Sequence, residues 1–579
     1  MWSRSVVFKA YFLLPLLAPI VWWWPRWGQG LFHKLERMLD RLALKPGRAV
    51  FAVGLVSFLF SAALGISIGI NPPQTHDEFG YLLIADTLAH GRLTNPPHSF
   101  WEHFESIYVL LQPTYTSKYP PAQGLALAIG EITTGLPIVG IWFTTALASA
   151  TVCWMLLAWM RPRWALVGGL LTAFHPQMIV WSQNYWGGAV AMAGGAIVLG
   201  AFRRLLRDPR PREAFWLGIG MAILANSRPY EGFVFCLLIC LTLGVWIISA
   251  RGPSWKVCLY RIAAPLLAVL AVLALQLAFY NYRVTGSAWQ MPYSVYQKAY
   301  GMAPLFVFQQ PKPEPVFRHA ELRALQLDSL AYYQRQRTSS DSLLAATWEK
   351  IHTLLESCLW SRLLVVPLLA LPWAMRGDRW LRLIIPGGAL FSATMLLGTW
   401  VHPHYAAPAV GFFVVLVVES MRQLKVMHSA SRRWGVALVR GVLVLCALSS
   451  VLTVGRLARV DRNRWDFQRE RIMAELATQP GRHLVFVHYQ PNHNPHREWV
   501  YNSADIDSAK TVVARIMSPP ENQQLRQYFA GRDLWIIEAD ATPAALLRLP
   551  DAAELPAPAP VHPEATTPNR DGSSGLDSN

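Results

Sequence analysis

The chain has 579 residues, of which 53% are hydrophobic and only 15% are charged. A soluble protein normally carries about 25% charged residues, so this composition excludes an ordinary soluble enzyme and indicates a polytopic membrane protein. The formal net charge of +17 could suggest nucleic-acid binding. The basic residues, however, stand in short clusters between apolar runs, which is typical of cytoplasmic loops, and we expect no nucleic-acid partner.

The N-terminal apolar patch at residues 10–24 is shorter than the roughly 20 residues that a span needs, and it contains two prolines. We interpret it as an interfacial or re-entrant segment, with a true span as the alternative. The later apolar runs predict about eleven transmembrane helices by hydropathy. These runs are residues 49–70, 136–160, 164–182, 187–202, 214–227, 231–250, 262–281, 358–375, 383–401, 404–421 and 434–456.

Clusters of Lys and Arg alternate with these runs along the chain. They lie at residues 34–48, 161–163, 203–212, 251–261, 376–382 and 422–433. With the N-terminus in the cytoplasm, every cluster falls on the cytoplasmic side, as the positive-inside rule requires. We therefore divide the chain into an N-terminal segment, an all-α transmembrane domain with two long outer loops, an outer C-terminal domain and a disordered tail. Their ranges are 1–48, 49–456 (loops 71–121 and 282–357), 457–554 and 555–579.

The outer regions contain their own secondary-structure signals. An amphipathic helix is expected at residues 82–90, ended by Gly91, and a helical region at residues 321–355. In the C-terminal domain, residues 483–489 and 533–538 read as strands and residues 504–516 as a helix, which predicts a small α/β unit.

Two adjacent carboxylates, Asp77 and Glu78, follow the first apolar run and two prolines. Charged side chains at a membrane boundary are costly and usually mark a working site, although a solvated acidic loop would look the same. Three other polar stretches reach the same face under this topology: residues 115–124, 225–232 and 400–405. A further segment, residues 184–188, ends in two glycines that permit a close backbone approach.

Several cations and histidines could act with these carboxylates. Arg228 stands between apolar segments, where it either clamps a phosphate or pairs with Glu231 to fix a helix break. Lys118 precedes two prolines and could also bind phosphate, or be a surface lysine. His402 and His404 are weak metal candidates, and a hydrogen-bonding role suits them equally. The C-terminal histidines at 488, 493 and 496 could form a metal cluster or be solvated loop residues.

Together these pieces resemble the GT-C glycosyltransferases, in particular the family-39-like and aminoarabinose-transferase-like membrane enzymes of bacteria. The resemblance covers residues 49–456 and depends on Asp77-Glu78, the 118–121 segment, the 228–231 break and the 405–408 span start. It implies transfer of a sugar from a polyprenyl-phosphate lipid to an envelope glycan, lipid or protein acceptor. It also implies a bacterial inner membrane location with a periplasmic C-terminus. The resemblance does not extend to the C-terminal unit, whose role stays open.

Such a transfer needs a base for the acceptor hydroxyl and cations for the leaving phosphate. We expect Asp77 to be the base and Glu78 to be the second choice, since neighbouring helical residues point about 100° apart. The expected ligand-binding residues are Arg228, Lys118, His404, Tyr405, Tyr119 and His76. A single base suits an inverting transfer, and the sequence requires no cofactor, although a divalent metal could take part.

Two other functions remain open. A transporter or flippase of lipid-linked saccharides would place ionisable residues near the middle of its spans, whereas here they gather at the outer ends. A non-catalytic scaffold would use the C-terminal domain to bind partners.

Overall fold

The computed structural model describes residues 12, 14–15, 17–23, 26–249, 252–359, 362–427, 434–550 and 552–561. Most of the expected disordered tail and part of the N-terminal patch therefore lie outside the described residues. Within that patch, α2 (Leu17–Trp23) is a short helix that packs against the last membrane helix, α22. It is followed by α3 (Gln29–Ala43).

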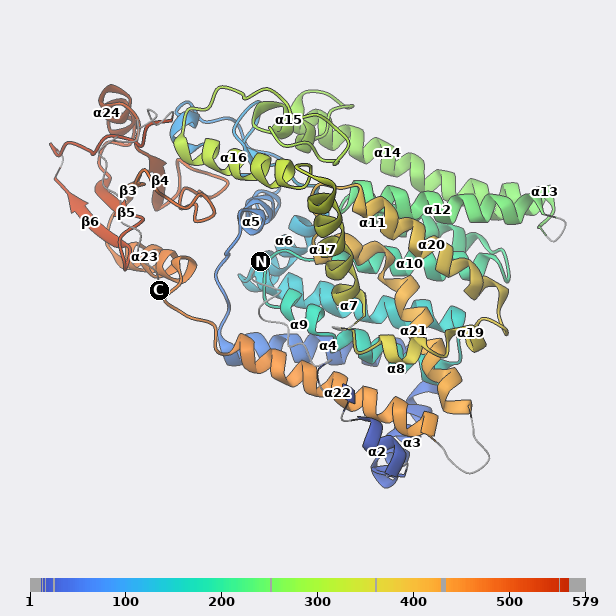
Figure 1. Cartoon of the computed structure of the whole chain (residues 1–579). Coiled ribbons are helices and arrows are strands. Elements are labelled where there is room, and N and C mark those ends of the chain that lie inside the picture. The colour runs from blue at the N-terminus through green and yellow to red at the C-terminus, as the bar shows by residue number, and fades with distance from the viewer. Residues whose placement is uncertain are drawn as a thin grey trace.

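Apolar helices form the main body of the molecule (Figure 1). Among the described residues, six helical segments are long and apolar enough to cross a membrane. They are α4 (Pro46–Ile68), α7 (Pro137–Trp159), α12 (Pro229–Ile248), the continuous segment Trp255–Thr285 made of α13, η3 and α14, Pro403–Val426 made of η4 and α21, and α22 (Trp434–Leu457). Many of these helices begin with proline, which has no N–H to lose at the first helical position.

Shorter helices fill the space between these segments, so the expected count of about eleven spans is not confirmed. The 164–182 run breaks into α8 (Pro162–Ala173) and α9 (Pro176–Trp181), because Pro176 cannot continue the preceding helix. The 358–375 run becomes two single turns, α18 (Val365–Leu368) and α19 (Leu371–Ala374). The other short helices are α10 (Ala189–Leu205), α11 (Pro211–Ala225) and α20 (Arg379–Leu396).

Both outer loops are well structured. The first contains α5 (His76–Ala89), η2 (Trp101–Phe104) and a two-stranded hairpin of β1 (Val109–Leu110) and β2 (Thr116–Ser117), and α6 (Pro121–Thr134) follows it. The expected helix at 82–90 is therefore part of α5, which starts earlier, and Gly91 follows it with a positive φ of 70°. The second loop contains α15 (Pro292–Ala299), α16 (Ala320–Arg335) and α17 (Ser340–Cys358), which confirms the helical character of residues 321–355.

The C-terminal unit is a four-stranded sheet with the order β4-β3-β5-β6. Strands β3 (His483–His488), β4 (Thr511–Arg515) and β5 (Asp533–Glu538) are parallel, and β6 (Ala545–Leu549) is antiparallel to β5. The remaining helices are α23 (Trp465–Thr478) and α24 (Pro519–Tyr528). The two expected strands are confirmed, but the helix expected at 504–516 is wrong. Its second half is β4, a β-branched run that is buried along its length and so lacks the alternation of a half-exposed strand.

This unit shares a hydrophobic core with the first outer loop. Leu484 and Phe486 of β3 belong to the same buried cluster as Leu83 of α5 and Phe104 and Leu111 of the loop. In Figure 1 the C-terminal unit lies at the end of the molecule where α5 and α16 also lie. The C-terminal unit is thus packed directly against the helix that carries Asp77.

Candidate active site

The first turn of α5 holds the two acidic residues in different roles. Glu78 is 2% exposed and forms a capping box with Thr75. Its carboxylate accepts the backbone N–H groups of Gln74 at 2.7 Å and Thr75 at 3.0 Å, and that of Tyr185 at 2.9 Å. Burial raises the pKa of Glu78 to about 7, although these N–H donors act against the shift. The Glu78 carboxylate therefore fixes the start of α5 to the 182–188 loop.

Asp77 points elsewhere and is only half-buried. Its Oδ1 accepts a hydrogen bond from the Tyr119 hydroxyl at 2.5 Å. Burial, and then the Asp77 charge, raise the pKa of Tyr119, so that its hydroxyl stays protonated and continues to donate. This hydrogen bond occupies Oδ1 and leaves Oδ2 for other partners.

Lys118 lies among four tyrosine rings. Its Nζ is 3.2 Å from the ring centroid of Tyr108 and 4.8–5.1 Å from those of Tyr296, Tyr119 and Tyr293. The side chain is only 6% exposed, and its burial lowers the pKa of Lys118 to about 7, while the Asp77 carboxylate raises it in part. The ring faces attract the ammonium ion of Lys118, whereas its burial favours the neutral amine. The charge of Lys118 is therefore sensitive to pH and to nearby charged groups.

Arg228 brings a second cation to the same place. It precedes α12, and its guanidinium carbon lies 5.0 Å from the ring centroid of Tyr405. Glu231 of α12 is 7% exposed, and its charge is among those that raise the pKa of Arg228 against the effect of burial. Burial raises the pKa of Tyr81 to about 12, and both the Arg228 and the Asp77 charges act on its hydroxyl. Asp77, Lys118 and Arg228 are therefore within electrostatic reach of one group of tyrosines.

His404 and His402 stack on each other, with ring centroids 5.6 Å apart and planes 8° apart. His404 is 4% exposed, and its ring lies 4.6 Å from Trp186 and 4.7 Å from Tyr405. Among the described residues, no group of three or more His, Cys, Asp or Glu side chains is placed to hold a metal ion. The three C-terminal histidines each pair with a different acidic residue: His488 with Glu538, His493 with Asp540 and His496 with Asp328.

His76 joins α5 to the C-terminal unit. Its Nδ1 lies 2.9 Å from the Tyr501 hydroxyl, and burial lowers the pKa of His76 to about 4. The Tyr501 ring stacks on Phe79 at 3.9 Å, and the backbone N–H of Ala504 donates to Asp86 at 2.6 Å. We therefore place His76 in this interface.

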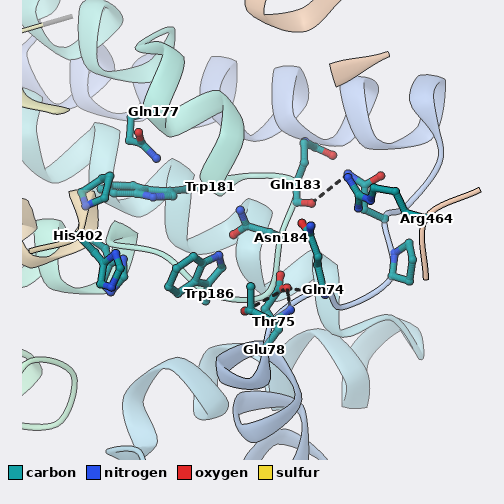
Figure 2. Close-up of a pocket in the computed structure, with 14 residues that line it drawn as sticks. Gln74, Thr75, Glu78, Gln177, Trp181, Gln183, Asn184, Trp186, His402 and Arg464 are labelled. Atoms are coloured by element: carbon teal, nitrogen blue, oxygen red, sulfur yellow. Dashed lines mark hydrogen bonds between the residues drawn. The ribbon is translucent and has the colours of Figure 1, made fainter. Parts of the chain in front are cut away.

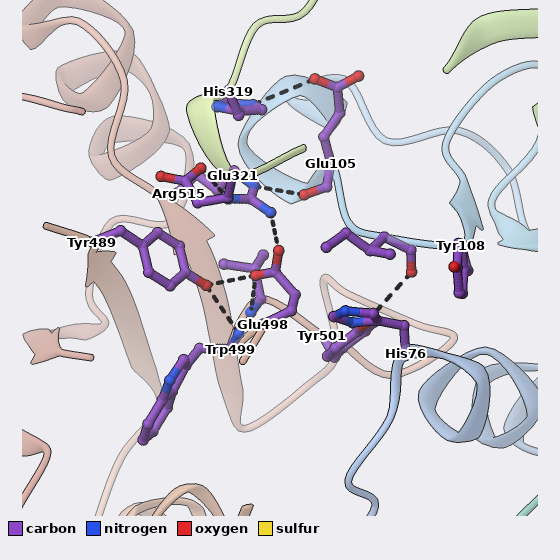
Figure 3. A network of polar contacts seen from close by, with 12 residues as sticks. His76, Glu105, Tyr108, His319, Glu321, Tyr489, Glu498, Trp499, Tyr501 and Arg515 are labelled. Carbon is purple, nitrogen blue, oxygen red and sulfur yellow. Dashed lines mark hydrogen bonds and ion pairs between the residues drawn. The ribbon is translucent and has the colours of Figure 1, made fainter. Parts of the chain in front are cut away.

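A buried ionic network reinforces the interface (Figure 3). Arg515, at the end of β4, donates to Glu498, to Glu321 of α16 at 2.8 Å and to the Glu105 carbonyl oxygen at 2.7 Å. Although burial favours the neutral acid, the Arg515 guanidinium lowers the pKa of Glu498, which is 1% exposed. One side chain thus connects both outer loops with the C-terminal unit.

A separate cavity of about 730 Å³, measured with its open mouth, adjoins the first turn of α5 (Figure 2). Glu78 lines it, together with the 181–186 segment, the two stacked histidines and Arg464. Asp77, Lys118 and Arg228 are not among its lining residues. The neighbouring carboxylates of α5 therefore belong to two adjoining sites.

Sequence reasoning missed several of these residues. The Thr75–Glu78 spacing is a capping-box signature, which would have indicated a structural role for Glu78. The tyrosines of the cage come from residues 108–119 and 293–296, and no local pattern connects these segments. The close backbone approach at the two glycines is confirmed, because a Cβ on Gly188 would lie 2.5 Å from the Trp181 ring.

Comparisons with known proteins give a fold. No family model matches the chain, and no curated protein does. Among solved structures, ArnT from Cupriavidus metallidurans in the apo state is 12% identical, with 84% of this chain and 91% of that chain covered at a TM-score of 0.50. The same protein bound to undecaprenyl phosphate gives a TM-score of 0.47 with 84% and 92% covered, again at 12% identity. The Archaeoglobus fulgidus oligosaccharyltransferase in the apo form is 12% identical, with 84% and 69% covered at a TM-score of 0.47.

Proposed function

We propose that this chain, which has the fold of the GT-C superfamily, is a membrane glycosyltransferase that moves a sugar from a polyprenyl-phosphate-linked donor to an acceptor hydroxyl. The observation that supports this most directly is the grouping of Asp77, Lys118 and Arg228 around shared tyrosines. One carboxylate and two cations are the charges that an inverting transfer from a lipid phosphate requires. The surrounding apolar helices suit a polyprenyl chain.

In the proposed step, the acceptor oxygen forms a bond to the anomeric carbon as the bond from that carbon to the phosphate oxygen breaks. Asp77 takes the acceptor proton, and polyprenyl phosphate leaves with the electron pair. Lys118 and Arg228 stabilise the charge that grows on the phosphate. Tyr119 holds the Asp77 carboxylate in position through its hydrogen bond. Because two side-chain cations act on the phosphate, we expect the reaction to need no divalent metal.

The charges at the opposite end of the helices support the proposed orientation. Arg163 of α8 and Lys425 of α21 both pair with Glu36 of α3, at 3.1 Å and 2.6 Å. These belong to the basic clusters that the positive-inside rule assigns to the cytoplasm. We therefore propose that the N-terminus is cytoplasmic and that α5 and the C-terminal unit face the periplasm of a bacterial inner membrane. The acceptor would then be an envelope glycan, lipid or protein.

The test is transfer by the purified protein from a panel of polyprenyl-phosphate sugars to detergent-extracted envelope material. Asp77→Asn should lower kcat by about 10²–10⁴-fold, as loss of a general base does. Glu131→Gln, a similar change on α6 outside the tyrosine group, is the matched control and should retain activity. Unchanged transfer by Asp77→Asn would exclude Asp77 as the base. Lipid-linked saccharide translocation by proteoliposomes without any transfer would overturn the enzymatic proposal.

A further inference from the structure

The cavity beside Glu78 has an unusual lining. Five of its residues carry amide side chains: Asn71, Gln74, Gln177, Gln183 and Asn184. Two more, Trp181 and Trp186, carry indole rings. Amides that donate and accept hydrogen bonds, next to flat apolar rings, match the alternating hydroxyls and C–H faces of a sugar ring.

Two of these amides have buried atoms without a partner. Gln177 is 7% exposed and Asn184 is 5% exposed, yet Gln177 Nε2 and Asn184 Oδ1 have no hydrogen-bond partner among the described residues. Figure 2 shows Asn184 in the middle of the lining, between Trp186 and Gln74. An unpaired buried polar atom costs about 1–3 kcal/mol. Both residues line the cavity, and a hydroxyl group both donates and accepts, so it would match one unpaired donor and one unpaired acceptor.

The charges in the cavity are already paired. The Glu78 carboxylate accepts three backbone N–H groups, and Arg464 pairs with Asp466. Among the described residues that line the cavity, no unpaired cation is therefore left for a phosphate, in contrast to the site around Lys118. The lining suits a neutral polyhydroxylated ligand.

We propose that this cavity binds a neutral saccharide, with Gln177 and Asn184 as its hydrogen-bonding residues and Trp181 and Trp186 as its apolar walls. Because Glu78 follows Asp77 on α5, a saccharide here would lie beside the carboxylate that acts as base. That placement rests on the proposed function, whereas binding itself does not. The saccharide could be the donor sugar or a sugar of the acceptor.

The first measurement is saccharide binding to the full-length protein in detergent, followed by tryptophan fluorescence. The probes are D-mannose, D-galactose, N-acetylglucosamine and L-arabinose at millimolar concentrations. We expect at least one to give a saturable change, weakened tenfold or more by Gln177→Met. Gln326→Met is the matched control, since Gln326 is also 7% exposed and lies outside the cavity lining. It should bind like the unmodified protein.

Stability separates a ligand-binding role from a structural one. Because Gln177 Nε2 has no partner, Gln177→Met should leave the melting temperature unchanged or raise it. Weaker saccharide binding with intact stability supports the proposal, whereas a destabilised variant with unaltered binding overturns it. The absence of binding by every probe also overturns it, and does so whatever Asp77→Asn shows. In transfer assays, a higher KM for the lipid donor or for the acceptor would identify the source of the saccharide.

Discussion

If Lys118 binds the lipid phosphate as proposed, its burial in the tyrosine cage should make that binding depend on pH. Burial lowers the pKa of Lys118 from 10.5 to about 7, so the free protein loses this cation as the pH rises through neutrality. A pH of 9 lies about two units above the pKa of Lys118, so roughly 1% of the molecules carry the positive charge on this residue. The apparent Kd for a phosphate ligand that requires the cation should therefore rise about 100-fold from pH 6 to pH 9, which is about 2.7 kcal/mol.

Undecaprenyl phosphate is a suitable probe for this effect, with equilibrium binding measured in nanodiscs at several pH values. Lys118→Arg should bind with little pH dependence, because a guanidinium stays charged throughout this range. Lys118→Met should bind weakly at every pH. The ionisation of the lipid itself affects all three proteins equally, so it cancels when their apparent Kd values at the same pH are divided by one another. Equal pH profiles for the unmodified protein and Lys118→Arg would refute the assignment of Lys118 as a phosphate-binding cation.

Further predictions concern stability and metal dependence. Arg515→Ala leaves Glu498 and Glu321 buried without their cation and should cost about 3–5 kcal/mol, seen as early proteolysis of the C-terminal unit. Arg548→Ala, at an exposed pair, should cost under about 1 kcal/mol, and a similar loss in both variants would contradict the role of the network. Gly188→Ala should lower the melting temperature, at a cost of about 1–3 kcal/mol, because its Cβ would lie 2.5 Å from the Trp181 ring. Gly30→Ala should leave the melting temperature unchanged, because a Cβ at this position would meet no atom within 4 Å. EDTA should leave transfer unchanged, and restoration of an EDTA-inhibited enzyme by a divalent ion would show that the two cations are insufficient.

The packing of the C-terminal unit onto α5 gives that unit a structural part in the proposed site. Tyr501 contacts both His76 and Phe79, one residue on either side of the Asp77–Glu78 pair. Removal of residues 457–579 would expose this side of α5 and the shared core around Leu83. A scaffold function for the unit would not require these contacts with the helix that carries Asp77.

The amino-acid sequence by itself determined the properties that depend on local pattern. Hydropathy located the apolar helices, and the basic clusters indicated which helix ends lie on the same side of the membrane. Both signals are carried by residues that are neighbours in the sequence. The choice of Asp77, Lys118 and Arg228 as candidates came from a similar argument, since charge at a membrane boundary is costly wherever it occurs. The number of spans did not follow, because a short apolar helix packed between others has the same composition as a short span.

Only the tertiary structure decided which carboxylate faces which site. Asp77 and Glu78 are chemically similar neighbours, and their roles differ because Tyr119 lies on one side of α5 and the backbone of Tyr185 on the other. The lysine cage and the amide-lined cavity are likewise built from segments far apart along the chain. Their contacts arise from packing in three dimensions, which no periodicity or spacing in the sequence records.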